Sequence, residues 1–208
     1  MDEYKLLASL YDPLLHVVMH RVRRKVVDIV EALPHRNIID ICCGTGNQLK
    51  YLKRAGFSDI TGVDISRSML GQARKGKNKV PCDEQDASQM HYEDNTFELG
   101  IISFALHEKP EQAARKIISE AKRVIHPSGH LILVDYLFRG HVRVPARMTI
   151  HAVERMAGKD HYRYFKQYLS YGGMDHFMDA SSLKNEYRFH SNATGIRVYA
   201  MNKYGQYA

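Results

Sequence analysis

The stretch IIDICCGTGNQ, residues 38–48, decides the fold of this 208-residue chain. Its first half is a short apolar run, which predicts a buried strand. Gly44 and Gly46 then form a turn into a helix that we expect to begin at Asn47. Glycine has no β-carbon, so the backbone of such a turn can approach a ligand closely. Because ligands of open α/β sheets bind beyond the carboxyl ends of the strands, the stretch predicts a ligand-binding turn.

Two kinds of cofactor compete for this turn. A dinucleotide fold has the pattern G-x-G-x-x-G, whose third glycine allows close helix packing, but Leu49 stands at that position here. Asp40, four residues before Gly44, would repel a pyrophosphate and would suit a cationic ammonium group, directly or through water. The sequence therefore favours a cofactor with an amino acid moiety and no phosphate. An NAD(P) oxidoreductase is the less favoured alternative.

Two more aspartates stand at the ends of the next two expected strands. Asp64 lies 18 residues after Gly46, where a carboxylate can accept both hydroxyls of a ribose. Asp86 ends the third strand, where a carboxylate can accept from an adenine amino group. Each aspartate alone is also typical of an ordinary surface loop. Three acids at three consecutive strand ends, together with the glycine turn, predict a nucleoside site.

Strand and helix signals alternate on both sides of this stretch. Such alternation indicates βαβ units with right-handed crossovers, and hence an α/β fold with a doubly wound, mostly parallel sheet and helices on both faces. The expected strands are 37–42, 59–64, 80–85, 97–103 and 130–137, and the expected helices are 14–33, 47–55, 66–75 and 110–125. After residue 140 we expect helices over 142–156 and 161–171, then a C-terminal antiparallel hairpin of 185–190 and 195–201.

The length of the chain favours a single domain over residues 1–208. We assign 1–36 to an N-terminal helical cap and 37–137 to the cofactor-binding core. Residues 138–208 are assigned to a helical insertion and a hairpin that shape the substrate site. Basic residues lie between the apolar positions of the helix over 14–33. They form either a solvated helix face or a surface for a membrane or an anionic substrate.

The composition is that of a globular protein. Hydrophobic residues make up 44% and charged residues 25%, and no apolar run approaches the ~18 residues of a membrane span. The N-terminus lacks the basic and apolar regions of a secretory signal, and Cys42, Cys43 and Cys82 form neither a disulfide framework nor a CxxC metal pair. We therefore expect a reduced, cytoplasmic protein without metal ligands. The net charge of +7 allows nucleic acid, an anionic membrane or an anionic small molecule as partner and selects none.

The motifs together resemble the class I S-adenosylmethionine-dependent methyltransferases. DICCGTG at 40–46 looks like their first motif, Asp64 like their ribose-binding acid, and Asp86-Ala87 like their adenine-contacting pair. Residues 97–103 and 131–135 look like their fourth and fifth strands. The common first motif has three alternating glycines, and a cysteine, residue 42, occupies the first of these positions.

Within the class, Tyr11-Asp12, residues 40–46 and Leu106-His107 look most like the ubiquinone/menaquinone-biosynthesis group and its small-molecule relatives. The resemblance implies a Rossmann-like fold, S-adenosylmethionine as cofactor and S-adenosylhomocysteine as product. Methyl transfer from a sulfonium is an in-line displacement, in which positioning can remove roughly 7–11 kcal/mol of the barrier. The implied cofactor site consists of Tyr11, Asp40, Cys42, Gly44, Gly46, Asp64, Ile65, Met69, Asp86, Ala87 and Ser103.

His107 is the candidate catalytic residue, because it follows the fourth strand, where cofactor and acceptor should meet. A histidine there can remove a proton from a carbon or hydroxyl acceptor, or it can simply be a polar residue at a helix entry. His107-Glu108 lacks the second histidine of a zinc-protease helix, so that interpretation is rejected. The aromatic and basic segment 161–168 either stacks on an aromatic acceptor or binds its anionic group, or it forms an amphipathic cap with core aromatics.

The favoured function is methyl transfer to a small-molecule acceptor, preferably a lipid-soluble phenol, quinol or amine. A nucleic-acid or protein methyltransferase is the first alternative, which the net charge supports. Against it, residues 103–106 read SFAL, where amino-methylating nucleic-acid enzymes typically have an Asn/Asp-Pro-Pro-Tyr/Phe motif. The second alternative is a non-catalytic S-adenosylmethionine-binding protein. The expected partners are a small-molecule acceptor and a membrane surface contacted through the basic N-terminal helix; nucleic acid is disfavoured, and the sequence does not determine the oligomeric state.

Overall fold

A computed structural model describes residues 7–138, 142–179, 184–191 and 193–201. Seven strands form one sheet in the order β3-β2-β1-β4-β5-β7-β6. The parallel strands are β1 (Ile38–Ile41), β2 (Ile60–Asp64), β3 (Cys82–Glu84), β4 (Phe97–Ser103) and β5 (Ile125–Tyr136). The antiparallel hairpin consists of β6 (Lys184–Ser191) and β7 (Thr194–Ala200), and β7 pairs with β5. The predicted fold class is confirmed.

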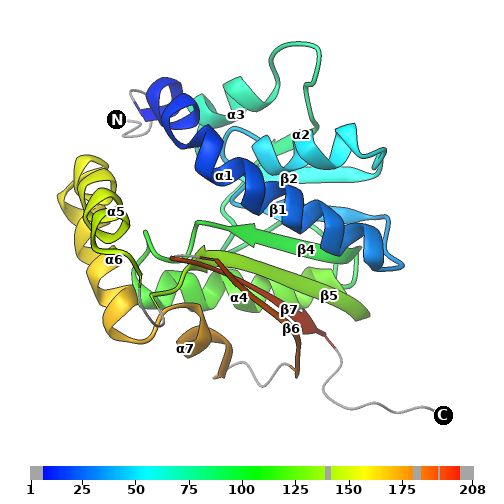
Figure 1. Ribbon diagram of the computed structural model, residues 1–208. Coiled ribbons are helices and arrows are strands. Elements are labelled where there is room, and N and C mark those ends of the chain that lie inside the picture. Colours follow the sequence, from blue (N-terminus) through cyan, green and yellow to red (C-terminus); the bar gives the residue numbers. More distant parts are fainter. Residues whose placement is uncertain (1–6, 139–141, 180–183, 192, 202–208) are drawn as a thin grey trace.

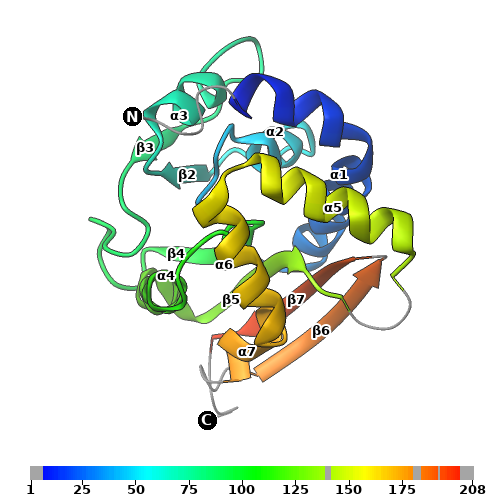
Figure 2. The same cartoon turned by 90° about the vertical axis from the view of Figure 1, so that its left-hand side faces the viewer.

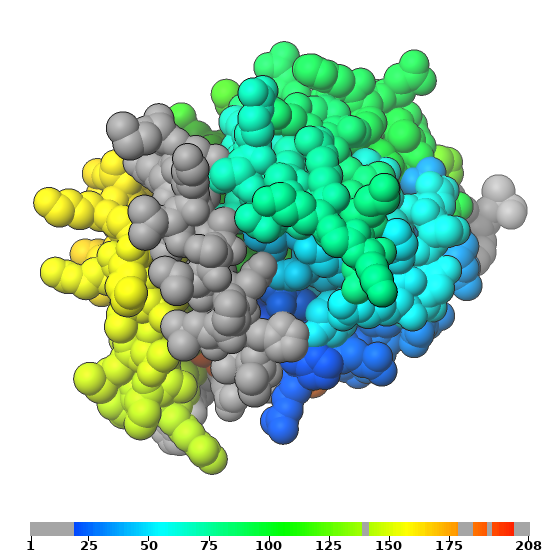
Figure 3. Space-filling view, turned by 90° about the horizontal axis from the view of Figure 1, so that it is seen from above, coloured from blue at the N-terminus to red at the C-terminus, as the bar shows by residue number. Residues whose placement is uncertain are grey.

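The helices cover both faces of the sheet (Figure 1). On one face lie α1 (Leu7–Ala32), α2 (Asn47–Arg54) and α3 (Arg67–Ala73), and on the other lies α4 (Glu111–Val124). Three more helices follow β5: α5 (Val144–Met156), α6 (Lys159–Ser170) and α7 (Met174–Asp179). Figures 1 and 2 show α5 and α6 on the side of the molecule toward which the β4 arrow points. Seen from above, the yellow α5–α6 region and the cyan and green N-terminal half lie on opposite sides of the molecule (Figure 3).

The alternation of strand side chains divides the core into two layers. Ile38 of β1 and Ile101 of β4 belong to the layer that contains α1, α2 and α3. Ile39 and Ile41 of β1 and Ile102 of β4 belong to the layer that contains α4 and α6. Because successive side chains of a strand point to opposite faces, these parallel strands are buried on both sides. Only their carboxyl ends are left to form a site.

The apolar face of α1 is used in this core. Val22, Val26 and Val30 are buried against the sheet, whereas Arg21 and Arg24 are exposed to solvent. A helix that lies in a membrane interface needs its apolar face free, so the structure does not support anchoring through this part of α1. Within the described ranges, no helix is both long and apolar enough to cross a bilayer.

Most elements lie within about two residues of their expected bounds, and three differ more. α1 begins at Leu7 rather than at residue 14 and continues through Pro13, although proline cannot donate the intrahelical hydrogen bond. β5 begins at Ile125 rather than at residue 130, because Ile125 pairs with Phe97 before residues 126–129 bulge out of the ladder. Pro127 fits such a bulge, since it has no N–H to contribute. The short helix α7 was not predicted at all.

Candidate functional site

A cavity of about 370 Å³ opens at the carboxyl ends of β1, β2, β3 and β4. Its size lies in the range of small-molecule sites. Most of the predicted cofactor residues line it: Asp40, Cys42, Gly44, Asp64, Ile65, Met69, Asp86, Ala87 and Ser103. Gly46 does not line the cavity but packs against α3. Tyr11 lies in α1, and its side chain falls outside the described part of the chain.

The turn after β1 has the conformation that its glycines require. Gly44 and Gly46 have φ angles of 54° and 67°, and Cys42 has a φ of 60°. Cys42 thus adopts a left-handed conformation, which glycine adopts without strain and which costs another residue about 1–2 kcal/mol. Burial raises the pKa of its thiol to about 12, so Cys42 is not a reactive nucleophile. The N–H of Cys43 donates to the Val63 carbonyl at 2.9 Å and fixes the turn to the end of β2.

Asp64 links the turn to the second strand. Its Oδ2 accepts from the Gly44 N–H and its Oδ1 from the Ser66 N–H, each at 2.8 Å. Burial raises the pKa of Asp64, and the two backbone donors act in the opposite direction. The carboxylate is thereby fixed at the cavity wall, and each oxygen keeps a lone pair for a further donor such as a ribose hydroxyl.

Two buried polar atoms at the cavity have no hydrogen-bond partner. Throughout the described ranges, Asp40 Oδ1 and Ser103 Oγ are the side-chain nitrogen or oxygen atoms in this condition. Asp40 is 2% exposed, and burial raises its pKa well above the usual range of an aspartate. Native structures rarely leave such atoms unsatisfied unless a ligand or water completes them. Because both residues line the same cavity, the two atoms indicate where polar groups of a ligand bind.

The residues expected to contact an adenine lie at another edge of the cavity. Ala87 is buried, and the Asp86 carboxylate accepts from the Ser88 N–H at 2.8 Å, which lowers the pKa of Asp86. Ile65 is 65% exposed even though it lines the cavity. An exposed isoleucine beside Met69 provides apolar surface on which a flat ring can pack.

His107 is placed differently from the expectation. It is 1% exposed and is not among the residues that line the cavity. Its Nδ1 lies 2.7 Å from Asp135 Oδ1, and its Nε2 lies 3.4 Å from Glu154 Oε2. Burial lowers the pKa of His107, but the charges of Asp135 and Glu154 outweigh it and raise this pKa well above the usual range. Both ring nitrogens therefore face carboxylates rather than an acceptor in the cavity.

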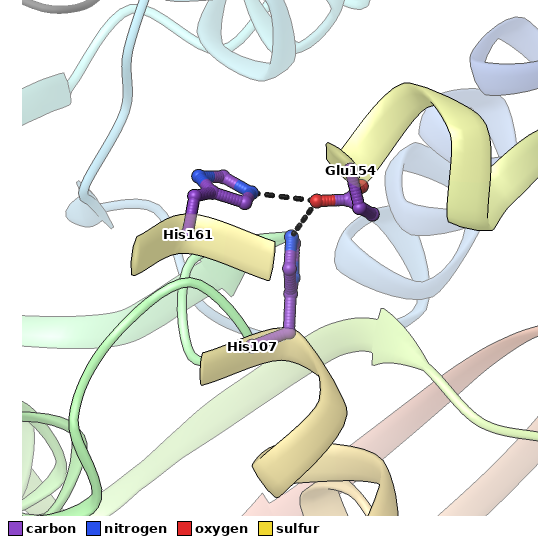
Figure 4. A group of neighbouring side chains, drawn as sticks. All are labelled: His107, Glu154 and His161. Atoms are coloured by element: carbon purple, nitrogen blue, oxygen red, sulfur yellow. Dashed lines mark hydrogen bonds and ion pairs between the residues drawn. The ribbon is translucent and has the colours of Figure 1, made fainter. Parts of the chain in front are cut away.

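His161 is the histidine that lines the cavity, and sequence reasoning did not bring it together with His107. Its Nε2 lies 2.6 Å from Glu154 Oε2, so Glu154 stands between the two imidazoles (Figure 4). The rest of the segment 161–168 agrees with the expectation of an amphipathic cap, since Phe165 and Tyr168 are buried in the core. No signal in the sequence marks Glu154, which occupies an ordinary polar position of a helix.

Other lining residues were also missed. They come from α1, from the loop between β4 and α4, from α4 itself and from the end of α5: Met19, Val22, Arg23, Glu108, Lys109, Ala113, Ile117 and Ala157. The cavity therefore extends beyond the predicted cofactor residues toward α4 and the junction of α5 and α6. That extension provides room for a second ligand next to the first.

Residues 38–129 match a family described as a methyltransferase domain. The ubiquinone/menaquinone biosynthesis C-methyltransferase of Roseobacter denitrificans is 30% identical over 142 residues, which cover 62% of this chain and 55% of that protein. The demethylmenaquinone methyltransferase of Renibacterium salmoninarum is 32% identical over 116 residues, or 56% of this chain and 48% of that protein. The chain thus spans about half the length of these relatives.

Solved structures show the same fold. An S-adenosylmethionine-dependent methyltransferase from Thermotoga maritima superposes with a TM-score of 0.70 at 17% identity, covering 96% of this chain and 99% of that one. Similarity at this level of identity shows the fold alone. It extends, however, over the helices and the hairpin that follow residue 138, where the family match has ended.

Proposed function

We propose that this chain, residues 38–129 of which match a methyltransferase domain, is a class I S-adenosylmethionine-dependent methyltransferase that transfers the methyl group of S-adenosylmethionine to a small-molecule acceptor. The finer proposal is that the acceptor is a lipid-soluble phenol, quinol or amine. Two relatives bear the names of quinone-biosynthesis methyltransferases, which supports an acceptor of this class. A nucleic acid is too large to be enclosed by a cavity of about 370 Å³, although it could present one base to it.

The observation that carries the proposal is the unpartnered carboxylate oxygen of Asp40. A buried acceptor without a donor costs about 1–3 kcal/mol, and more when it is charged. A cationic ammonium group would supply a hydrogen-bond donor to this oxygen and a positive charge that compensates the carboxylate. A pyrophosphate would instead add electrostatic repulsion. The polar atoms that the cavity leaves unsatisfied therefore fit the methionine moiety of S-adenosylmethionine better than NAD(P).

S-adenosylmethionine supplies, when bound, a methyl group activated by a sulfonium. In the proposed site Asp40 binds the ammonium group, Asp64 accepts from the ribose hydroxyls, and Asp86 and Ala87 contact the adenine. The Gly44 N–H and Asp64 hold one another in place, so the turn and the ribose-binding acid are fixed before a ligand arrives. Such preorganisation lowers the entropic cost of aligning the methyl group with an acceptor.

The acceptor is proposed to bind where the cavity extends toward the C-terminal helices. Ala113, Ile117 and Ala157 provide an apolar wall, and Glu108 and His161 provide polar atoms. An aromatic or isoprenoid-bearing molecule with one hydroxyl or amino group matches this combination. In this proposal residues 138–208 complete the substrate site, and residues 37–137 hold the cofactor.

Methyl-labelled S-adenosylmethionine tests the proposed function directly. Purified protein is incubated with the label and with cell extract divided into lipid-soluble, small polar and macromolecular fractions. We expect label in the lipid-soluble fraction with the wild type, and at least about 10-fold less with Asp64→Ala when S-adenosylmethionine is kept below the wild-type Kd. Label confined to the macromolecular fraction would replace the proposed acceptor by nucleic acid or protein. S-adenosylhomocysteine binding without any label transfer would point to a non-catalytic binding protein.

Replacing Asp64 with alanine is expected to weaken S-adenosylhomocysteine binding about 10- to 150-fold. The loss corresponds to about 1.5–3 kcal/mol, the worth of hydrogen bonds to a charged group. Isothermal titration calorimetry measures the change. Asp59→Ala removes an exposed aspartate just before the same strand and should bind like the wild type. Equal affinities of the two variants would remove Asp64 from the site.

Replacing Asp40 with asparagine is expected to change ligand affinity and stability in opposite directions. Burial raises the folded pKa of Asp40 above the unfolded value of about 4. The unfolded chain therefore loses its proton first, and the ligand-free protein loses stability progressively as the pH rises from the unfolded to the folded pKa. Asparagine has no charge to bury, so at pH 7 the ligand-free variant should have a higher Tm. Its S-adenosylhomocysteine affinity should fall at least about 10-fold, since the counter-charge of the ammonium group is lost. A variant that loses both stability and affinity would contradict this assignment.

A further inference from the structure

Three residues from separate elements bring their donor atoms together beside the cavity. His107 follows β4, Glu154 lies in α5 and His161 lies in α6. Figure 4 shows the three side chains pointing toward one another, with the glutamate between the two imidazoles. The side chains of His107 and Glu154 are each 1% exposed, and that of His161 is 13% exposed. None of the three belongs to the cofactor site proposed above.

The donor atoms have the chemistry and spacing of a metal site. One atom from each residue can be chosen so that all three lie within 4.8 Å of one another. Imidazole nitrogens and carboxylate oxygens bind zinc at about 2.0–2.2 Å, so two donors of one tetrahedral ion lie about 3.3 Å apart. The 3.4 Å between His107 Nε2 and Glu154 Oε2 matches that separation. The 2.6 Å between His161 Nε2 and Glu154 Oε2 is a hydrogen-bond distance, which an ion would widen.

Outer partners orient two of these side chains. Asp135 Oδ1 lies 2.7 Å from His107 Nδ1, which directs Nε2 of the same ring toward the centre of the group. The Tyr136 hydroxyl donates to Glu154 Oε1 at 2.9 Å, which directs Oε2 toward the centre. A carboxylate on the far nitrogen of a histidine is the usual second partner of a metal-binding imidazole. Adjacent residues at the end of β5 thus hold both buried donors.

The third side chain has a weaker partner of the same kind. Glu108 Oε2 lies 3.6 Å from His161 Nδ1, on the side of the ring away from Glu154. Both Glu108 and His161 line the cavity, whereas His107 and Glu154 do not. The group is therefore closed toward the core and accessible from the cavity, which gives an ion a path of entry.

The two carboxylates of the group lie in the protein interior. The side chains of Asp135 and Glu154 are 2% and 1% exposed, and a buried carboxylate must be compensated. Within the described ranges, their side-chain partners are the two histidines and Tyr136, with no lysine or arginine in an ion pair to either. Asp135 also accepts from the backbone N–H groups of Leu106, His107 and Tyr136, so Glu154 is the carboxylate that faces the centre of the group.

From this geometry we propose that His107, Glu154 and His161 bind one zinc ion. Two histidines and one glutamate form a three-ligand set that leaves a further coordination position open. His161 places that ion at the cavity wall, next to the extension assigned to the acceptor. There the ion can bind an oxygen or nitrogen of the acceptor, a role that rests on the proposed function. The proposal reverses the expectation that the chain has no metal ligands.

Metal content of the whole chain tests the proposal. The protein is stripped with a chelator, loaded with Zn²⁺ or with Co²⁺ as a spectroscopic substitute, and dialysed against metal-free buffer. We expect about one ion per chain to be retained, with the visible Co²⁺ absorption of a four- or five-coordinate site. The His161→Ala variant should lose this ion and this absorption, and its partly exposed side chain makes it the variant that best preserves the fold.

His151→Ala is the matched control, because this half-buried histidine also lies in α5 but forms its hydrogen bond with the Tyr162 hydroxyl, at 3.1 Å, and is not part of the three-residue group. It should retain the ion. Retention of equal metal by His161→Ala would place the ion elsewhere and overturn the proposal. Folded wild-type protein that binds S-adenosylhomocysteine but retains no ion would also overturn it, and would leave a hydrogen-bonded ion network in its place. The second result does not affect the proposed methyl transfer, which depends on label transfer and cofactor affinity.

Discussion

Replacement of His107 with alanine is expected to lower the free energy of unfolding by about 3–5 kcal/mol. The imidazole contacts Asp135 and Glu154, and both carboxylates are almost completely buried. Without it, two buried charges lose their shared partner and a cavity forms in the core. Urea unfolding followed by circular dichroism measures the loss. The effect is larger than that of an ordinary point mutation, because an uncompensated charge is among the most costly changes to a protein interior.

Comparison of His107→Ala with His151→Ala distinguishes a histidine that stabilises the core from a base that faces the acceptor. His151→Ala removes ring contacts and a hydrogen bond to the Tyr162 hydroxyl, but it leaves in place the ion pairs that the described residues form with Asp135 and Glu154, so it should cost about 1 kcal/mol. If His107 acted as a base at the cavity, methyl transfer would fall while the two variants unfolded at similar urea concentrations. A clear difference in their unfolding midpoints, with wild-type S-adenosylhomocysteine affinity in the fraction that remains folded, supports the anchoring role. Two equal midpoints would contradict it.

The cofactor half of the site could be predicted from the sequence because its determinants are local. The glycine turn, Asp64 and Asp86 each follow a strand within a few residues, and the carboxyl ends of parallel strands meet at one edge of a sheet. Ser66 likewise lies directly before α3, where its side chain accepts from the Met69 N–H and caps the helix. The bounds of Phe97–Ser103 could be predicted to the residue, since this strand is mostly buried and forms a continuous apolar run from Leu99 to Ile102.

The acceptor half could not be predicted in the same way. Glu154 and His161 lie 47 and 54 residues beyond His107, and they meet it because α5 and α6 fold back over the carboxyl ends of the strands. Glu154 is 1% exposed, yet its position in a mixed helix looks like any solvated glutamate in the sequence. Such a contact depends on tertiary packing, which neither propensity nor spacing encodes. The position of His107 could be predicted because the strand before it is adjacent in sequence. Its environment could not be predicted because its partners lie far away in the chain.

Replacement of Gly44 with valine is expected to reduce S-adenosylhomocysteine affinity at least about 1,000-fold, or about 4 kcal/mol. Gly44 has a φ of 54°, and an added β-carbon would meet no protein atom within 4 Å. The variant should therefore fold, with a strain of about 1–2 kcal/mol, while its side chain occupies space beside the turn that a ligand needs. Gly44 also lines the cavity and donates to Asp64, so a shift of its backbone would disturb the ribose site as well.

Gly46→Val is the control that distinguishes a loss of ligand affinity from a loss of stability. A β-carbon at Gly46 would lie 2.8 Å from Val80 Cγ2 and 3.0 Å from Ala73 Cβ, and Gly46 does not line the cavity. We expect this variant to lose about 1–3 kcal/mol of stability through overpacking, added to the strain of its left-handed conformation. Calorimetric titration and thermal unfolding of both variants should thus give opposite rankings, with Gly44→Val the weaker binder and Gly46→Val the less stable protein. Wild-type affinity in a folded Gly44→Val protein would show that the cofactor does not approach this turn, and the assignment of the cavity would have to be abandoned.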